Sequence, residues 1–252
     1  MWKKIVTILV LVAFETVSTA FGATYVGLPK GVIHQAYVDY NDSDTINIAA
    51  GYGECNGHYW EITSTLSHDM NSLASGEDYH YIYIDDVNSL YPTPTFYDST
   101  VEPAWSDLQL GWYNGNDRCI GVVWSPAGSA TIMKFHTNSD LKYITDGEIK
   151  RVVDNGNPTG SGIIVEATAY TPVNAIAAYV EAWNSDTDYC YVAAYSADNP
   201  WSYLRATSYS GTAYAVGWLQ FKRGDSRDLM WNGEDNDDDY FKLRIEGFQI
   251  ER

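Results

Sequence analysis

Basic residues are scarce in this chain. Its 252 residues contain 15 Lys and Arg against 33 Asp and Glu, which gives a formal net charge of −18 at pH 7. A surface this negative repels a phosphate backbone, so the composition argues against a nucleic-acid-binding protein. Hydrophobic residues make up 45% of the chain, which is enough to build a folded core. The length suggests one large domain or two of ordinary size.

Long apolar runs are also scarce. The run Ile5–Phe14 has ten residues, follows Lys3 and Lys4, and precedes small residues at 18–20 and at 22. Ten residues are too few to cross the ~30 Å hydrocarbon core of a bilayer, whereas this arrangement is typical of a secretory signal peptide. We therefore expect residues 1–22 to be cleaved. The mature protein should be secreted or held at the cell surface, without a membrane span.

The chain has three cysteines, Cys55, Cys119 and Cys190. An oxidising compartment allows one disulfide, and Cys55 with Cys119 is the favoured pair because both lie in the same half of the chain. The alternative is three reduced, buried cysteines that behave as small hydrophobic residues. No CxxC motif occurs, which excludes thioredoxin-like chemistry and zinc ribbons.

Signatures of catalysis are missing. The sequence has no GxSxG elbow, HExxH motif, Walker loop or GxGxxG motif, and its five histidines show no metal-ligand spacing. Two carboxylates held ~5–10 Å apart could hydrolyse a glycosidic bond, and Glu166 and Glu181 are the best candidates because they lie in apolar stretches. They also fit as two solvent-facing strand residues, so we predict that the protein is not an enzyme.

Period-2 alternation of apolar residues is present along most of the chain, and no stretch reads as an amphipathic helix. This pattern predicts an all-β protein of two antiparallel modules, the second a β-sandwich or jelly roll. We expect an N-terminal module at 23–153, a linker at 154–162 rich in Asn, Gly, Pro and Ser, and the sandwich at 163–252. The expected strands include Thr45–Ala50, Tyr79–Ile84, Cys119–Trp124, Thr131–Phe135, Gly162–Tyr170, Ala175–Asn184, Asp188–Ser196, Thr212–Lys222 and the region after Phe241, with a turn at Gly51–Gly57.

Several strand and turn motifs of the first half resemble a β-rich module of phage tail fibres and other virion surface proteins. The segment Pro172–Ala178 resembles the start of the small β-sandwich that can follow this module. The resemblance implies a structural, fibre-like protein, and the signal peptide suggests a cellular, exported relative. The matching motifs are Ile46–Gly51, Asp78–Ile84, Pro94–Phe96, Leu110–Trp112, Cys119–Gly121 and Ile132–Phe135.

An acidic tract precedes the final expected strand. Asp235, Asp237 and Asp239 occupy positions 1, 3 and 5 of an EF-hand-like numbering, and such oxygen ligands suit Ca²⁺. Tyr240 stands where an EF-hand needs Gly, so the expectation is a Ca²⁺ site in a loop rather than an EF-hand. A solvated acidic turn is the alternative. A second acidic group, Asp39, Asp42 and Asp44, is a weaker candidate.

Aromatic residues that keep a polar group are abundant, with Tyr 21 and Trp 9. Such rings can stack on sugars or fill a subunit interface. Trp201, Tyr203 and Tyr195 lie in segments rich in Ser, Asn and Thr and are the candidate ligand-binding residues. The leading hypothesis is a non-enzymatic structural or adhesive protein that forms homo-oligomers, as a trimer or filament. The alternatives are a soluble glycan-binding protein and, third, a polysaccharide hydrolase.

One expected strand lacks the usual protection against pairing with another chain. Residues Thr212–Trp218 contain no charged side chain, although charged residues commonly protect sheet edges from association. If this strand lies at an edge, it favours self-association, and a charge at Tyr214 should weaken that contact.

Overall fold

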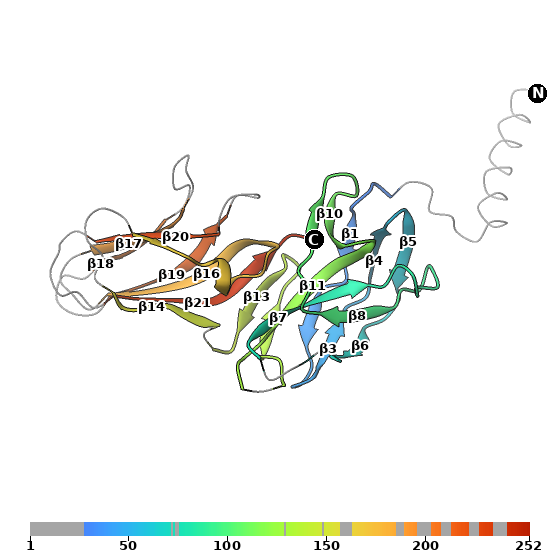
Figure 1. The fold of residues 1–252 in the computed structure, drawn as a ribbon, viewed down its shortest axis with the longest axis horizontal. Helices are drawn as coiled ribbons and strands as arrows, with labels where there is room; N and C mark the ends of the chain where they lie inside the picture. The colour runs from blue at the N-terminus through green and yellow to red at the C-terminus, as the bar shows by residue number, and fades with distance from the viewer. Residues whose placement is uncertain are drawn as a thin grey trace, which may run out of the picture.

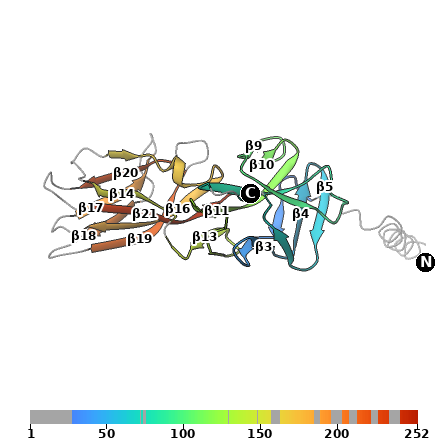
Figure 2. The same ribbon diagram turned by 60° about the horizontal axis from the view of Figure 1, so that its bottom comes forward.

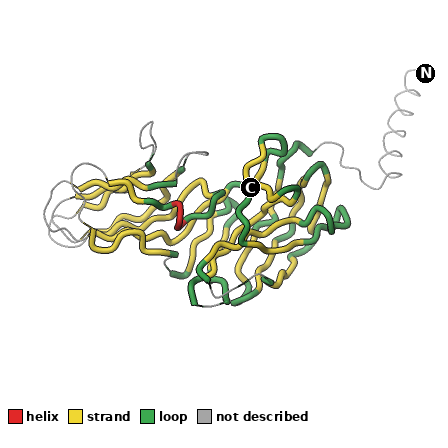
Figure 3. The backbone as a smooth tube through the Cα atoms, viewed as in Figure 1, coloured by secondary structure: helices red, strands yellow, loops and turns green. Residues whose placement is uncertain are grey.

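The protein consists of two β modules that lie end to end (Figure 1). The computed structural model describes residues 28–71, 73, 76–128, 130–147, 149–156, 163–184, 189–195, 203–207, 213–221, 227–233 and 241–252. Strands and loops account for nearly all of these residues, with one 3-10 turn at Thr168–Tyr170 (Figure 3). The all-β class is therefore confirmed. The expected signal peptide at 1–22 lies outside the described residues.

The N-terminal module contains three antiparallel sheets, with strand orders β1-β4-β5, β2-β3-β6 and β8-β7-β11-β10-β9. In Figure 1, β3, β4 and β5 run across the long axis of the molecule. The strands are β1 (Ile33–Gln35), β2 (Val38–Tyr40), β3 (Thr45–Ile48), β4 (Gly51–Cys55), β5 (His58–Ile62), β6 (Leu66–Asp69), β7 (Asp78–Ile84), β8 (Phe96–Ser99), β9 (Ala104–Ser106), β10 (Gly111–Asn114) and β11 (Asp117–Ser125).

Strand β7 is the centre of this module. It pairs with β8 on one side and β11 on the other, and every residue from Tyr79 to Ile84 is buried. The alternation of tyrosines with His80, Ile82 and Ile84 predicted this strand. The glycine-rich stretch Gly51–Gly57 is not a turn throughout: its first five residues form β4, and the turn is confined to its last two. There Asn56 and Gly57 have φ values of +48° and +87°, which suits a two-residue hairpin.

The C-terminal module is a sandwich of two antiparallel sheets, with orders β12-β13-β21-β16-β19 and β15-β20-β17-β18, and β14 also pairs with β21. Its long strands run along the long axis of the molecule (Figure 2). The strands are β12 (Phe135–Thr137), β13 (Lys142–Thr145), β14 (Lys150–Gly156), β15 (Ile163–Val165), β16 (Ala175–Asn184), β17 (Tyr189–Ala194), β18 (Tyr203–Thr207), β19 (Ala213–Gln220), β20 (Leu229–Gly233) and β21 (Phe241–Ile250).

The sheet pairing begins earlier in the chain than the expected domain boundary. Strands β12, β13 and β14 precede residue 157, yet all three belong to the sheet of β21. The first residues of the expected linker, Asp154–Gly156, form the end of β14 and pair along Phe241–Lys242. The remaining linker residues, 157–162, lie outside the described part of the chain.

Two expected strands are shorter or displaced. The strand expected at Thr131–Phe135 is replaced by β12, which begins at Phe135. Ile132 and Met133 do not pair with one partner strand, because their backbone N–H groups donate to the carbonyls of Ser43 and Trp124, in two separate segments. In place of Gly162–Tyr170, β15 ends at Val165 and the 3-10 turn follows.

The alternation of buried and half-buried residues in β21 shifts by one position within the strand. Phe241, Leu243 and Ile245 are buried, and the buried positions then become Phe248 and Ile250. The register with β16 skips one residue between Ile245 and Gly247, which is a β-bulge. The bulge moves the apolar side of the strand back into the core, and Gly247 packs against the backbone of Tyr143 at this point.

The modules share a continuous interface. The ring of Tyr79 in β7 packs edge-on against Phe248 in β21, with centroids 5.7 Å apart, and the Tyr79 hydroxyl donates to the Tyr170 carbonyl at 2.7 Å. Arg252, which lies between the modules in Figure 1, donates through Nη1 to the carbonyls of Gln35 and Ala36 at 2.7 and 3.0 Å. Buried rings and backbone hydrogen bonds thus connect the two modules.

The expected Cys55–Cys119 disulfide is absent. Both cysteines are free and buried. The Cys55 Sγ lies 3.6 Å from the Asn116 carbonyl at the end of β4, whereas the Cys119 Sγ lies 3.4 Å from the Gly121 carbonyl within the core. Each thiol thus contacts a different carbonyl. Cys190 lies in β17, and its side chain is outside the described part.

These two thiols should be unreactive in the folded protein. Burial raises the pKa of Cys55 to about 11 and that of Cys119 to about 12, so both are protonated at pH 8, where only the thiolate reacts. In a Cys190→Ser variant we expect no labelling by a thiol reagent at pH 8, and labelling of both thiols in denaturant. Rapid labelling of the native protein, or a denatured sample without free thiols, would contradict this prediction.

Candidate functional site

Strand β19 lies at the end of its sheet. Within the described residues it pairs with β16 from Ala177↔Gln220 to Asn184↔Ala213, and no strand follows it on the other side in that sheet. In Figure 2, β18 of the facing sheet lies along the same margin of the module and packs beside β19. The uncharged segment identified in the sequence is therefore an edge strand.

The backbone of β19 directs hydrogen-bonding groups toward this open edge. Just beyond the strand, the Phe221 N–H donates to the Ile176 carbonyl at 2.7 Å, toward β16. Along an antiparallel strand, successive residues direct their N–H and C=O groups to alternate sides. Counting back from Phe221, Tyr214, Val216 and Trp218 direct theirs away from β16. These three residues form the open edge.

The side chains of the same residues lie on the outer face of the sheet. Tyr214 is 64% exposed and Val216 is 48% exposed, whereas Leu219, on the opposite face, is fully buried. On β16, the directly opposed residues are Trp183, Glu181 and Tyr179, all half-buried. We call this surface the aromatic face; its residues are Tyr179, Glu181, Trp183, Tyr214, Val216 and Trp218, with Lys142, Lys242 and Arg244 beside them.

The aromatic face consists of two ring pairs with a lysine beside each. Tyr179 and Trp218 have ring centroids 5.1 Å apart, and the Lys142 Nζ lies 5.3 Å from the Trp218 ring. Trp183 and Tyr214 are 6.3 Å apart, and the Lys242 Nζ lies 5.2 Å from the Trp183 ring. These distances suit cation–π contacts.

A charged pair separates the two ring pairs. The Arg244 Nη1 lies 3.4 Å from a Glu181 carboxylate oxygen, in the same row as Val216. Lys142 also lies 4.0 Å from the Asp140 carboxylate, so three cationic side chains at the aromatic face stand against two carboxylates, although the whole chain has a net charge of −18. This surface can accept a flat, apolar or weakly anionic partner without strong repulsion.

The candidate ligand-binding residues do not belong to this face in the described structure. Tyr195 follows β17 in the facing sheet, is half-buried, and donates its N–H to the Asp228 carbonyl at 2.8 Å. Trp201 and the side chain of Tyr203 lie outside the described residues, so their role stays a prediction. Tyr179, Trp183 and Trp218 were not identified as a set, although their alternation within β16 and β19 is visible in the sequence.

The acidic tract that is expected to bind Ca²⁺ lies before β21. Asp235, Asp237 and Asp239 lie outside the described residues, so Ca²⁺ binding there stays a prediction. In the described part, no three His, Cys, Asp or Glu side chains are arranged to hold a metal ion. The Asp42 carboxylate instead accepts a hydrogen bond from the Asp44 N–H at 3.2 Å, and this contact lowers the pKa of Asp42.

The two candidate catalytic carboxylates lie apart. Glu166 is exposed and follows β15 in one sheet, whereas Glu181 lies on the outer face of the other sheet and pairs with Arg244. The body of that sheet separates them. The structure therefore does not bring Glu166 and Glu181 together as a glycosidase pair.

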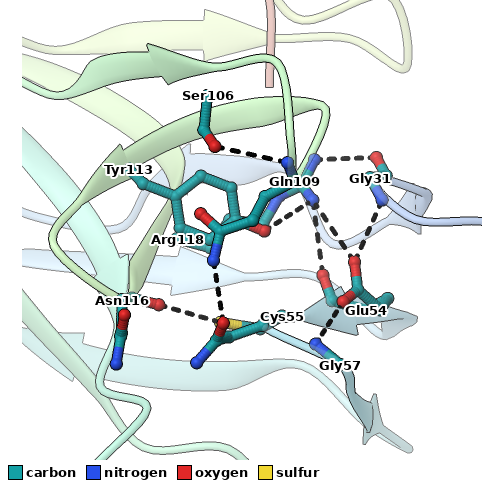
Figure 4. Close-up of polar contacts among 10 residues, drawn as sticks. Gly31, Glu54, Cys55, Gly57, Ser106, Gln109, Tyr113, Asn116 and Arg118 are labelled. Atoms are coloured by element: carbon teal, nitrogen blue, oxygen red, sulfur yellow. Dashed lines mark hydrogen bonds and ion pairs between the residues drawn. The ribbon is translucent and has the colours of Figure 1, made fainter.

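A second polar cluster lies inside the N-terminal module (Figure 4). Arg118 is fully buried and donates to the carbonyls of Gly31 and Glu54 at 2.7 and 3.4 Å, and to the Tyr113 hydroxyl at 3.1 Å. The Glu54 carboxylate lies 3.9 Å from Arg118 and accepts the N–H groups of Gly31, at 3.0 Å, and Gly57. Since these groups mainly bind backbone, we assign this cluster to stabilising the fold.

The comparisons with known proteins give little guidance. No family model and no curated protein matches the chain, so there is no family evidence for the tail-fibre module. One solved structure, described as the tryptic core of a Cry1Da variant from Bacillus thuringiensis, aligns with 94% of this chain at 10% identity and a TM-score of 0.20. The alignment covers 54% of that chain, and a likeness this small carries no conclusion. No helix in the described residues is long and apolar enough to cross a membrane.

Proposed function

We propose that this is a secreted, non-enzymatic structural or adhesive surface protein that self-associates through β19. The observation that carries the proposal is the coincidence, on one edge strand, of open backbone groups and exposed uncharged side chains. Edge strands of proteins that stay monomeric are usually shortened, bulged or charged. Strand β19 has eight residues and no charge.

Charge supports specific rather than random association. A net charge of −18 makes most pairs of surfaces repel each other. The aromatic face is an exception, because its three cationic side chains exceed the two carboxylates that pair with them, Glu181 and Asp140. Self-association should therefore tighten as salt screens the repulsion between the remaining surfaces.

Replacing Tyr214 with Asp should weaken this association. Tyr214 is 64% exposed on the edge strand, so the folded subunit tolerates the change, whereas a charge buried in the contact lacks a partner. We expect the dissociation constant to rise at least about tenfold, as measured by size-exclusion chromatography with light scattering.

The matched control for this experiment is Ile164→Asp. Ile164 is 50% exposed on β15, at the end of the facing sheet, and the change should leave the association intact. A wild-type protein that stays monomeric at high concentration and ~0.5 M salt would refute self-association.

The second candidate is a soluble glycan-binding protein. The ring pairs Tyr179–Trp218 and Trp183–Tyr214, each with a lysine beside it, favour it, since rings stack on sugars and cations bind acidic groups. In that case the wild type should be a monomer that is retained on a glycan resin. Trp183→Ala should abolish retention without changing the elution volume.

A further inference from the structure

We propose that two copies of this chain join β19 to β19 in antiparallel orientation, about a twofold axis that passes at Val216. The two outer sheets then form one continuous sheet. This inference rests on the proposed self-association and adds its partner, geometry and register.

The direction of the backbone groups restricts where the axis can lie. Residues directly opposite each other in an antiparallel pair share a face, and their N–H and C=O groups must point toward each other to bond. Tyr214, Val216 and Trp218 satisfy both conditions only with residues in the same alternation, that is, with even-numbered residues of β19. The axis must therefore pass at a residue of β19 and not between two residues.

Side-chain pairing then selects the residue. An axis at Val216 places Val216 opposite itself and Tyr214 opposite the partner's Trp218, twice by symmetry. An axis at Gly217 leaves glycine opposite glycine and places Tyr214 opposite the polar Gln220. An axis at Ala215 places Trp218 opposite residue 212, beyond the end of β19. Aromatic cross-strand pairs are among the most stabilising, so the register at Val216 is favoured.

This register also joins the aromatic faces of the two copies. Trp183 and Tyr214 of one copy continue into Trp218 and Tyr179 of the partner copy, giving a four-ring row with Lys242 beside Trp183 and Lys142 of the partner copy beside its Trp218. At the axis itself, the Val216 side chains of the two copies lie opposite each other. Glu181, one strand back from Val216, is paired with Arg244, and the two Lys142 side chains, each beside a Trp218, lie on opposite sides of the axis. No like charges meet at the seam, which is why a second copy fits this edge.

A twofold contact of this kind uses the same surface on both copies and closes after two. It therefore predicts a dimer rather than the trimer or open filament that the tail-fibre resemblance implies. The four-ring row repeats on each side of the axis, which makes the shared outer face twice as long as in one subunit.

Cysteine cross-linking tests the register directly. In a Cys190→Ser background, Val216→Cys places two thiols opposite each other, with Cα atoms about 5.5 Å apart, within the range of a disulfide. We expect mild oxidation to convert most of the protein to a covalent dimer on non-reducing gels.

Two control variants are used, one matched for side-chain exposure and one located on the same strand. The first is Ile164→Cys, since Ile164 is 50% exposed and Val216 is 48% exposed. Gln220→Cys lies on β19 itself, but its copies would be about 26 Å apart at ~3.3 Å per residue.

The register is supported if Val216→Cys cross-links at least tenfold more than both controls and the native mass is that of a dimer. Self-association with equal cross-linking of all three variants, or with cross-linking strongest at Gln220→Cys, would overturn the twofold register but leave the proposed function standing. A monomeric wild type would overturn both.

Discussion

Replacing Arg118 with Met is expected to lower the free energy of unfolding by about 3–5 kcal/mol, because the change removes one partner of a buried ionic pair. Arg118 is fully buried, and its guanidinium binds the Gly31 carbonyl, the Glu54 carbonyl and the Tyr113 hydroxyl. The variant leaves the Glu54 carboxylate without its cation, and the buried Glu54 carbonyl and the half-buried Gly31 carbonyl without this donor. Gly111 also packs on the guanidinium and would lose that contact.

Urea unfolding followed by tryptophan fluorescence measures this effect. The matched control is Lys134→Met, which removes the Lys134–Asp146 ion pair at 2.6 Å, whose side chains are 53% and 44% exposed. Exposed pairs contribute little, so this variant should unfold at the wild-type midpoint. Equal effects of the two substitutions would contradict a structural role for the Arg118 cluster. A double variant with Glu54→Gln should be less destabilised than the sum of the single changes, since it removes the unpaired carboxylate.

Gly247→Ala should produce the second large loss of stability, about 3 kcal/mol, at the upper end of the usual range for overpacking. A Cβ at this position would lie 2.2 Å from the Tyr143 carbonyl oxygen and 3.2 Å from the Ile144 Cα. Both are backbone atoms of β13, so relief requires the two strands to separate. The bulge in β21 lies here, and a shift would also disturb the stacking of Tyr143 on Phe248.

Gly147→Ala is the matched control for this glycine. No atom lies within 4 Å of the Cβ it would add, and the residue lies between β13 and β14 of the same sheet. Thermal unfolding should show a clear drop in melting temperature for Gly247→Ala and almost none for Gly147→Ala. Similar melting temperatures for both variants would mean that β13 and β21 can separate without cost.

Strands with strong alternation could be predicted from the sequence. Ala175–Asn184 was expected and is β16, and Tyr79–Ile84 forms nearly all of β7. The pairing of strands could not be predicted in the same way. The assignment of β12, β13 and β14 to the C-terminal sheet depends on β21, about a hundred residues later in the chain. The alternation of residues within a strand contains no information on a partner strand so distant in the sequence. The domain boundary expected at 154–162 was therefore based on amino-acid composition.

The candidate site was predictable only in part. The lack of charge in Thr212–Trp218 indicated an unprotected edge, and β19 is at the edge. The aromatic face also needs β16, whose Tyr179 and Trp183 lie about thirty to forty residues earlier and become neighbours of Trp218 and Tyr214 through the strand register. The expected Cys55–Cys119 disulfide was wrong for a related reason. Two cysteines in the same half of the chain need not be neighbours in the fold, and here each thiol contacts a different backbone carbonyl.

The hydrogen bonds of Arg252 set an order of events during synthesis. Arg252 binds the carbonyl of Gln35, from which it is separated by 217 positions in the chain. Contacts at such separation carry a large loop-closure entropy and form late. Gln35 and Ala36 both have positive φ values, +56° and +53°, and are the carbonyls that Arg252 binds. The N-terminal module therefore emerges from the ribosome first, but its turn at Gln35–Ala36 obtains these hydrogen bonds only after Arg252 has been added.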